Sequence, residues 1–187
     1  MKILTGALRG REISFKANPH LRPTADKVRK AIFDTLVGAT QGAHVLDLFS
    51  GTGALGFEAL SGGAAAAVFV EADKRQAAKI AENLKTLGLE KKGRVLSLDA
   101  LKAVQLLHRE GEVFDVVFLD PPYNEGWERK TAEEVVARPI LSKKSWVVME
   151  SAAKDIASPA TFGHLVKLKE KNYGDTRLVF YGASEEI

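Results

Sequence analysis

The tetrapeptide Asp120-Pro121-Pro122-Tyr123 combines residue types that can hold a planar amine. It follows the apolar run 116–119, which is typical of a buried strand, and open α/β sheets bind ligands outside the carboxyl ends of their strands. Neither proline has a backbone N–H, so the Pro121 carbonyl is held stiffly beside the Asp120 carboxylate. These two acceptors and the Tyr123 ring complement an exocyclic amine on a flat heterocycle. A strand-terminating turn is the simpler alternative.

A glycine loop follows an earlier apolar run, at 44–49. Gly51, Gly53 and Gly56 fit the pattern G-x-G-x-x-G, and Glu71 lies about 20 residues further on, at the end of the next predicted strand. This spacing is typical of dinucleotide-binding proteins, so a nicotinamide- or flavin-dependent oxidoreductase is one interpretation. A Walker A loop is excluded because no Gly-Lys-Ser/Thr follows.

Asp47, at the end of the first predicted strand, favours a different cofactor. A carboxylate there would repel a pyrophosphate at the helix N-terminus, but it suits the sulfonium and ammonium groups of S-adenosylmethionine. Glu71 would then accept from the ribose hydroxyls and Asp99 from the adenine amino group, although Asp99 could equally be a helix N-cap. The predicted cofactor site comprises Asp47, Ser50, Gly51, Thr52, Gly53, Glu71, Ala72, Asp99 and Ala100.

Strand and helix patterns alternate from residue 44 onward, which predicts βαβ units in a three-layer, Rossmann-like α/β fold. We expect a mostly parallel seven-stranded sheet whose last two strands form an antiparallel edge hairpin. With the acidic strand ends and the Asp120 motif, this order predicts a class I S-adenosylmethionine-dependent methyltransferase acting on an exocyclic amine. The predicted strands are 44–49, 67–71, 94–98, 115–119, 145–150, 165–171 and 177–181, and the helices are 54–60, 74–87, 101–109 and 128–137.

Basic charge is concentrated at the N-terminus. Residues 1–30 hold eight basic and two acidic side chains, a net charge of +6, whereas the whole chain carries +3. This asymmetry predicts a nucleic-acid contact surface, with a solvated basic face as the alternative. Residues 2–15 predict a small β-hairpin with Ile3 and Ile13 pointing inward. A helix capped by Thr24 and ended by Gly38 follows, with Lys27, Lys30 and nearby Arg29 on its exposed side. We therefore divide the chain into an RNA-contacting extension, 1–40, and a methyltransferase domain, 41–187.

Composition is typical of a soluble globular protein: 45% of residues are apolar and 27% are charged. The absence of cysteine is consistent with the cytoplasm, and no signal peptide or membrane-length apolar run is evident. The four histidines are scattered, so no metal site is predicted. We expect a cytoplasmic monomer without a membrane partner.

The chain resembles the RsmD family of small-subunit ribosomal RNA guanine-N2 methyltransferases. The resemblance rests on segments 6–11, 22–24, 27–33, 47–60, 114–123 and 171–178. It implies methylation of guanine 966 of 16S rRNA at N2, within a small ribosomal subunit or its rRNA. The catalytic residues would be Asp120, Pro121, Pro122 and Tyr123, and the RNA-binding residues would be Arg9, Arg11, Arg22, Thr24, Lys27 and Lys30.

Two alternatives remain open from the residues alone. The Asp-Pro-Pro-Tyr chemistry also serves an amino-methyltransferase acting on another RNA, on DNA or on a protein amide. An NAD(P)-dependent oxidoreductase using Gly51, Gly53 and Gly56 is the alternative from another class. Trp127 either covers the site as part of a loop or simply packs.

Overall fold

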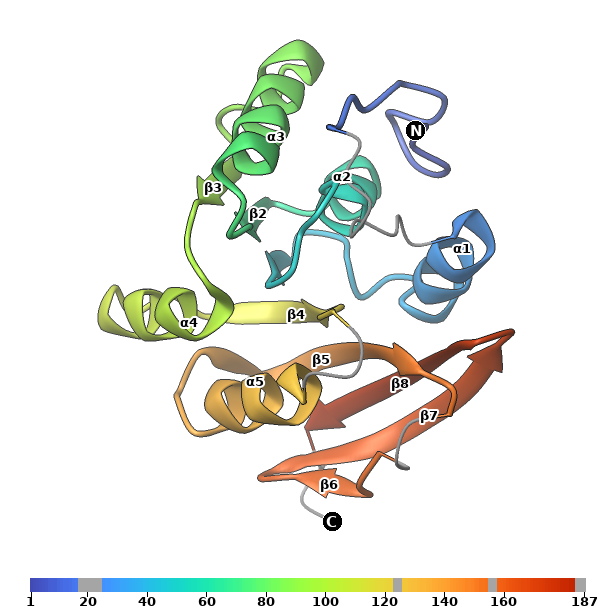
Figure 1. The fold of residues 1–187 in the computed structure, drawn as a ribbon, viewed down its shortest axis with the longest axis vertical. Coiled ribbons are helices and arrows are strands. Elements are labelled where there is room, and N and C mark those ends of the chain that lie inside the picture. The colour runs from blue at the N-terminus through green and yellow to red at the C-terminus, as the bar shows by residue number, and fades with distance from the viewer. Residues whose placement is uncertain (17–24, 123–125, 155–157, 184–187) are drawn as a thin grey trace.

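The computed structural model describes residues 1–16, 25–122, 126–154 and 158–183. The predicted alternation of strands and helices is confirmed, and Figure 1 shows helices on both sides of a twisted sheet. The elements are α1 (Asp26–Thr35), β1 (His44–Asp47), α2 (Ala54–Ser61), β2 (Ala66–Val70), α3 (Lys74–Leu87), β3 (Gly93–Leu96), α4 (Ala100–Arg109), β4 (Phe114–Leu119), α5 (Trp127–Val136), β5 (Leu141–Ala152), β6 (Thr161–Phe162), β7 (Leu165–Tyr173) and β8 (Thr176–Ala183).

The strands of the described chain form one sheet in the order β3-β2-β1-β4-β5-β8-β7-β6. Strands β1 to β5 are parallel to one another, and β8 pairs antiparallel with both β5 and β7. The sheet has eight strands rather than the expected seven because Thr161–Phe162 adds a short pairing to β7. Two residues give too short a pattern to predict a strand. The order reverses between β1 and β4, which is where an open α/β sheet binds its ligand.

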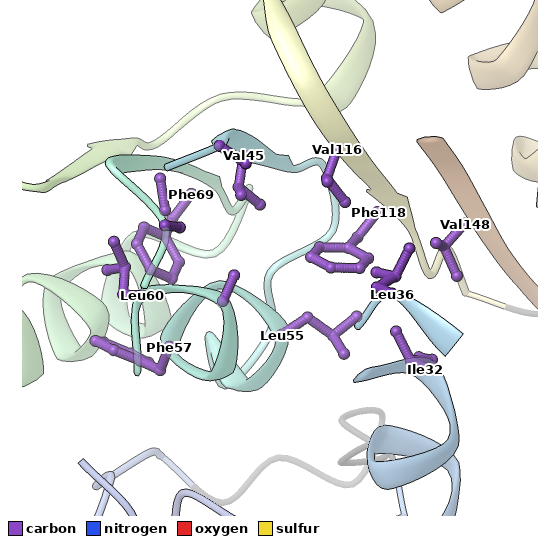
Figure 2. Packing of buried hydrophobic residues seen from close by; sticks show 14 of the residues in the cluster. Ile32, Leu36, Val45, Leu55, Phe57, Leu60, Phe69, Val116, Phe118 and Val148 are labelled. Carbon is purple, nitrogen blue, oxygen red and sulfur yellow. The ribbon is translucent and has the colours of Figure 1, made fainter. Parts of the chain in front are cut away.

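The sheet is buried on both faces over its parallel half. On β4, Val116 and Phe118 pack in one hydrophobic cluster, whereas Val117 and Leu119 pack in the other. Helices α1, α2 and α3 cover the first face, and α4 and α5 cover the second. Figure 2 shows Phe118 among residues of α1 and α2. Because both faces of β4 are buried, its sequence is a continuous apolar run and does not alternate between apolar and polar residues.

The N-terminal segment is less regular than the predicted hairpin. A single antiparallel bridge joins Lys2 to Glu12, and the backbone around it forms turns instead of two strands. The expected inward positions are nevertheless buried: Ile3 is 1% and Ile13 is 2% exposed, in the cluster that α1, α2 and α3 share. The division of the chain at residue 40 stays a prediction.

Buried polar side chains of the helices hold this segment in place. Glu58 of α2 accepts from the Leu4 N–H at 2.7 Å, the Thr5 N–H at 3.1 Å and the Thr5 hydroxyl at 2.9 Å. Asn83 of α3 accepts from the Ser14 N–H at 3.0 Å and donates to the Ser14 carbonyl at 2.7 Å. Segment 1–16 is therefore fastened to α2 and α3 through their side chains.

Arg29 corrects the prediction of a basic face on α1. Its side chain is 1% exposed and pairs with the equally buried Glu58 at 3.1 Å, while Lys27 and Lys30 are exposed as expected. The same guanidinium donates to the Lys2 carbonyl at 2.9 Å. Helix α1 has Ala25 as its N-cap residue, and Thr24, the expected cap, lies outside the described residues.

Candidate active site

The glycine loop connects β1 to α2 at the reversal point of the sheet. Gly53 is the N-cap residue of α2 and has a φ of 80°, in the left-handed region that favours glycine. Gly56 lies in the first turn of α2, where an added Cβ would be 2.2 Å from the Phe69 ring of β2. The loop can therefore bend sharply, and the helix can pack closely on the sheet, only because these two residues lack side chains.

Asp47 is the last residue of β1 and is 1% exposed. One of its oxygens, Oδ2, accepts from the Gly56 N–H at 3.2 Å, and the other, Oδ1, is buried without a hydrogen-bond partner among the described residues. The pKa of Asp47 is raised to about 7, mainly by burial and also by the nearby Glu71, against the lowering effect of the Gly56 and Phe49 backbone N–H groups. A buried carboxylate with an unsatisfied oxygen fits a positively charged ligand, because such a ligand would offset the cost of burial.

Glu71, at the end of β2, holds the glycine loop. Its carboxylate accepts from the Gly51 N–H at 2.8 Å and from the Asp73 N–H at 2.7 Å. Burial raises the pKa of this carboxyl, and these two hydrogen bonds lower it. The predicted role of Glu71 as an acceptor for ribose hydroxyls is compatible with this geometry because each carboxylate oxygen has a second lone pair. Ser50 and Thr52 are buried in the same loop, and Ala72 is exposed beside Glu71.

Asp99 is the N-cap residue of α4, as one of the two sequence interpretations expected. Its carboxylate accepts from the Lys102 N–H at 3.0 Å and pairs with the Lys102 ammonium at 2.9 Å. The Lys102 N–H holds the pKa of Asp99 below its ordinary value. Ala100 begins α4 and is buried. A contact between Asp99 and an adenine amino group stays a prediction.

Asp120 immediately follows β4 and lies at the same edge of the sheet as Asp47. Asp47 is in register with Phe118 of β4, and the Leu48 N–H donates to the Phe118 carbonyl at 3.1 Å. Asp120 is half-buried, Pro121 is buried and Pro122 is exposed. Tyr123 lies outside the described residues. The predicted amine-binding motif and the glycine loop therefore follow adjacent strands, at the point where the strand order reverses.

Phe49 was not among the predicted site residues, whereas Trp127 was predicted either to cover the site from a loop or to pack. Phe49, two residues beyond β1, packs edge-on against Trp127, the first residue of α5, with ring centroids 6.5 Å apart. The Lys130 ammonium lies 5.3 Å from the centre of the Trp127 ring. Trp127 thus packs beside the start of the glycine loop. The sequence signal for Phe49 was its place next to Ser50, directly after the strand that ends in Asp47.

The predicted RNA-binding residues are spread over two regions. Arg9 and Arg11 are exposed, and Arg11 donates to the Thr86 carbonyl at 3.4 Å, in the last turn of α3. Since α3 starts beside the site and runs away from it, its last turn lies toward the opposite edge of the sheet. On α1, Lys30 pairs with Asp34 at 2.7 Å. Arg22 and Thr24 lie outside the described residues.

Fold and site together define a class. The sheet order is that of the Rossmann-like class I methyltransferase fold, and a solved structure described as "Putative methyltransferase yhhF from Escherichia coli" has a TM-score of 0.84 at 31% identity, over 98% of this chain and 97% of that one. A solved structure, SMU.776 complexed with SAH, shares this fold with a TM-score of 0.68 at 18% identity, over 83% of this chain and 49% of that one. A structure of a hypothetical protein from Thermus thermophilus has a TM-score of 0.82 at 30% identity and covers 96% of this chain and 98% of its own.

The chain belongs to the family described as "Conserved hypothetical protein 95", whose model matches residues 1–182. The predicted resemblance to the RsmD family is confirmed by this match and by the curated relatives. YlbH of Bacillus subtilis is 34% identical over 181 residues, which cover 97% of this chain and 98% of that protein. "Ribosomal RNA small subunit methyltransferase D" of Escherichia coli K12 is 34% identical over 155 residues, which cover 83% of this chain and 76% of that protein.

Family and fold agree with S-adenosylmethionine as the predicted cofactor and disfavour the oxidoreductase alternative. The buried, unsatisfied oxygen of Asp47 fits this group because its sulfonium and ammonium are cationic. Within the ranges that the structure describes, no helix is both long and apolar enough to span a membrane.

Proposed function

We propose that this protein transfers a methyl group from S-adenosylmethionine to the exocyclic N2 of a guanine in small-subunit ribosomal RNA. By resemblance the target is guanine 966 of 16S rRNA. The chain is similar to proteins named as small-subunit rRNA methyltransferases over most of its length, which supports the substrate class. A cytoplasmic monomer that acts on the small subunit or its rRNA is part of the same proposal.

One observation carries the proposal: Asp120 follows β4 next to the strand that ends in Asp47. The parallel register pairs Asp47 with Phe118, two residues before Asp120. A carboxylate suited to a cationic cofactor and a pair of acceptors suited to an amine therefore lie at the carboxyl ends of adjacent strands. This adjacency supports transfer between two ligands bound side by side.

For methyl transfer, the residues of this chain have to orient the guanine amine and accept one proton. The lone pair of a guanine amine is delocalised into the ring, so the amine is a poor nucleophile. Asp120 and the Pro121 carbonyl accept hydrogen bonds from its two N–H groups, which orients the nitrogen and favours the charge that develops on it. Asp120 then takes the released proton. S-adenosylmethionine, when bound, supplies an electrophilic methyl group, and Asp47 and Glu71 bind its cationic and ribose portions.

Labelled methyl transfer tests this function. The protein is incubated with labelled S-adenosylmethionine and undermodified small subunits, naked rRNA or DNA, and the modified nucleotide is mapped. We expect label on N2 of one guanine in small-subunit rRNA. Label on DNA, on another base or on protein would instead support the alternative amino-methyltransferase, and the complete absence of transfer would refute both.

Asp120→Asn tests the amine-binding role. The substitution keeps the size of the side chain but removes its charge, so we expect kcat to fall roughly 100-fold or more while the Kd for the cofactor stays near that of the wild type. Asp175→Asn, in the exposed turn between β7 and β8, is the matched control. Equal kcat values for the two variants would exclude Asp120 from catalysis.

A further inference from the structure

Strand β7 lies beside α1 on one face of the sheet and carries exposed residues there. On that side α1 packs over β4, β5 and β8, and its Thr35 hydroxyl accepts from the Lys169 ammonium of β7 at 3.1 Å. Figure 1 shows the β7–β8 hairpin extending past α1 on the side where β4 and β5 end. Two exposed lysines of α1, Lys27 and Lys30, already belong to the predicted RNA-binding residues. Strand β7, beside this helix, contributes none of them.

Charge is segregated between the two faces of β7. Lys169 and Lys171 are in register with Phe180 and Leu178 of β8, which belong to the cluster on the α1 side. Glu170 is in register with Val179, which belongs to the other cluster, and it pairs with Lys167 at 2.7 Å. The face toward α1 therefore carries lysines, while the acidic residue between them points to the opposite face.

The lysines on this face keep their charge available to a ligand. Lys171 and Lys27 are exposed and form no ion pair with any residue that the structure describes. Lys169 is half-buried over the Phe180 ring, 5.9 Å from its centre, and one hydrogen bond to Thr35 leaves an ammonium group with two further donors. Tyr173, on the same strand, is half-buried against this cluster and offers an aromatic ring.

The surface leads toward the candidate active site. Strand β7 runs in the same direction as β5 because both are antiparallel to β8, so Lys169, Lys171 and Tyr173 advance toward the edge that holds Asp120. From Thr35 back to Lys27 is two turns of α1, about 12 Å at 1.5 Å per residue, and Lys169 to Tyr173 spans about 13 Å of strand. Lys27 and Tyr173 are therefore each about 12–13 Å, measured along their own element, from the contact between Thr35 and Lys169.

We propose that Lys27, Lys169, Lys171 and Tyr173, the α1–β7 surface, bind the phosphate backbone and a base of the substrate RNA next to the target nucleotide. The proposal rests on the proposed function and adds β7 to the RNA-binding surface. Unpaired lysines beside an aromatic ring are the chemistry that follows a nucleic-acid strand, because the cations neutralise phosphates and the ring stacks on bases. The occupant is RNA rather than an acidic protein because the surface combines these cations with a stacking ring.

The test measures RNA binding directly, without catalysis. The double variant Lys169→Gln/Lys171→Ala retains a hydrogen-bond donor toward Thr35 and removes two charges. We expect the Kd for naked small-subunit rRNA to rise about tenfold near 0.1 M salt, and the salt slope to fall by one to two units, since each phosphate contact contributes about 0.7–0.9. The Kd for S-adenosylmethionine should not change. Lys91→Ala/Lys92→Ala, two exposed lysines between α3 and β3, is the matched control.

The outcomes separate this surface from the proposed function. A double variant that binds rRNA like the Lys91/Lys92 control, with an unchanged salt slope, overturns the RNA-binding surface even if the wild type methylates rRNA. Weakened binding to assembled small subunits but not to naked rRNA also overturns it, because the occupant is then a ribosomal protein.

Tyr173→Ala, which removes the ring and no charge, should weaken rRNA binding while leaving the salt slope unchanged. A variant that binds as tightly as the wild type removes Tyr173 from the surface. Failure of methyl transfer by the wild type refutes the proposed function without altering these binding measurements.

Discussion

Asp47 and Glu58 are both 1% exposed, and Asp47 belongs to the predicted cofactor site while Glu58 fastens the N-terminal segment. Glu58 accepts from two backbone N–H groups and a hydroxyl and pairs with the buried Arg29. Asp47 has the Gly56 N–H for one oxygen, and its other oxygen is unsatisfied among the described residues. Burial alone therefore does not distinguish these two acids, whereas the number of their oxygens that have a hydrogen-bond partner does.

Of the substitutions considered, Glu58→Gln should lower the free energy of unfolding most. It removes the buried partner of Arg29 and leaves the exposed Asp26 as its ion-pair partner, and breaking a buried ion pair from one side costs about 3–5 kcal/mol. A urea titration monitored by circular dichroism measures the free energy of unfolding. The control is Glu82→Gln, an exposed residue paired with Lys79, which should change it by less than about 0.5 kcal/mol. Similar losses in both variants would mean that Glu58 is not a structural anchor.

Asp47→Asn should increase the free energy of unfolding at pH 8, whereas Glu58→Gln decreases it. The pKa of Asp47 is about 7 in the folded protein and roughly 3.9 in the unfolded chain, so the folded state retains a proton that the unfolded chain releases between these values. Its contribution to stability is complete below pH ~4 and is lost as pH rises to about 7. The cofactor-free variant should therefore be more stable than the wild type at pH 8, by about 2–4 kcal/mol. A less stable variant at pH 8 would contradict a costly buried charge at Asp47.

Cofactor binding by the Asp47→Asn variant should change in the other direction. The neutral amide cannot offset a positive charge, so the Kd for S-adenosylmethionine should rise roughly 10–100-fold in isothermal titration calorimetry. For the wild type, affinity should increase with pH up to about 7 and then level off, since only the ionised Asp47 attracts the cofactor. A pH-independent affinity would separate Asp47 from the cofactor.

Asp99→Ala should have the smallest effect on stability, because loss of an N-cap costs about 1 kcal/mol. Asp73→Ala provides a matched control, since Asp73 caps α3 by accepting from the Arg75 and Gln76 N–H groups. If Asp99 also contacts adenine, only Asp99→Ala should weaken cofactor binding. Equal cofactor affinities in the two variants would leave Asp99 as a helix cap.

Much of the fold could be predicted because its signals are local. The apolar run before Asp120 is a strand, Asp73 and Gly88 bound α3, and the glycine loop connects β1 to α2 as expected. Helical spacing predicts a buried face of α3 made of Ala77, Ile80, Ala81, Leu84 and Leu87, and this is partly wrong, because Ala81 is exposed and Asn83 is buried. Asn83 is inside because it binds Ser14, a partner 69 residues away that periodicity cannot indicate.

The sequence by itself determined the order of the acidic strand ends, the glycine loop and the amine-binding motif, because strand direction carries each of them to the same edge of a parallel sheet. Only the tertiary structure decided which charges are engaged. Arg29 belongs to the same basic run as Lys27 and Lys30, yet it is buried against Glu58, while Lys171 lies exposed beyond α1. The physical reason is that a charge is paired or available according to partners distant in the chain, and the fold alone brings those partners together.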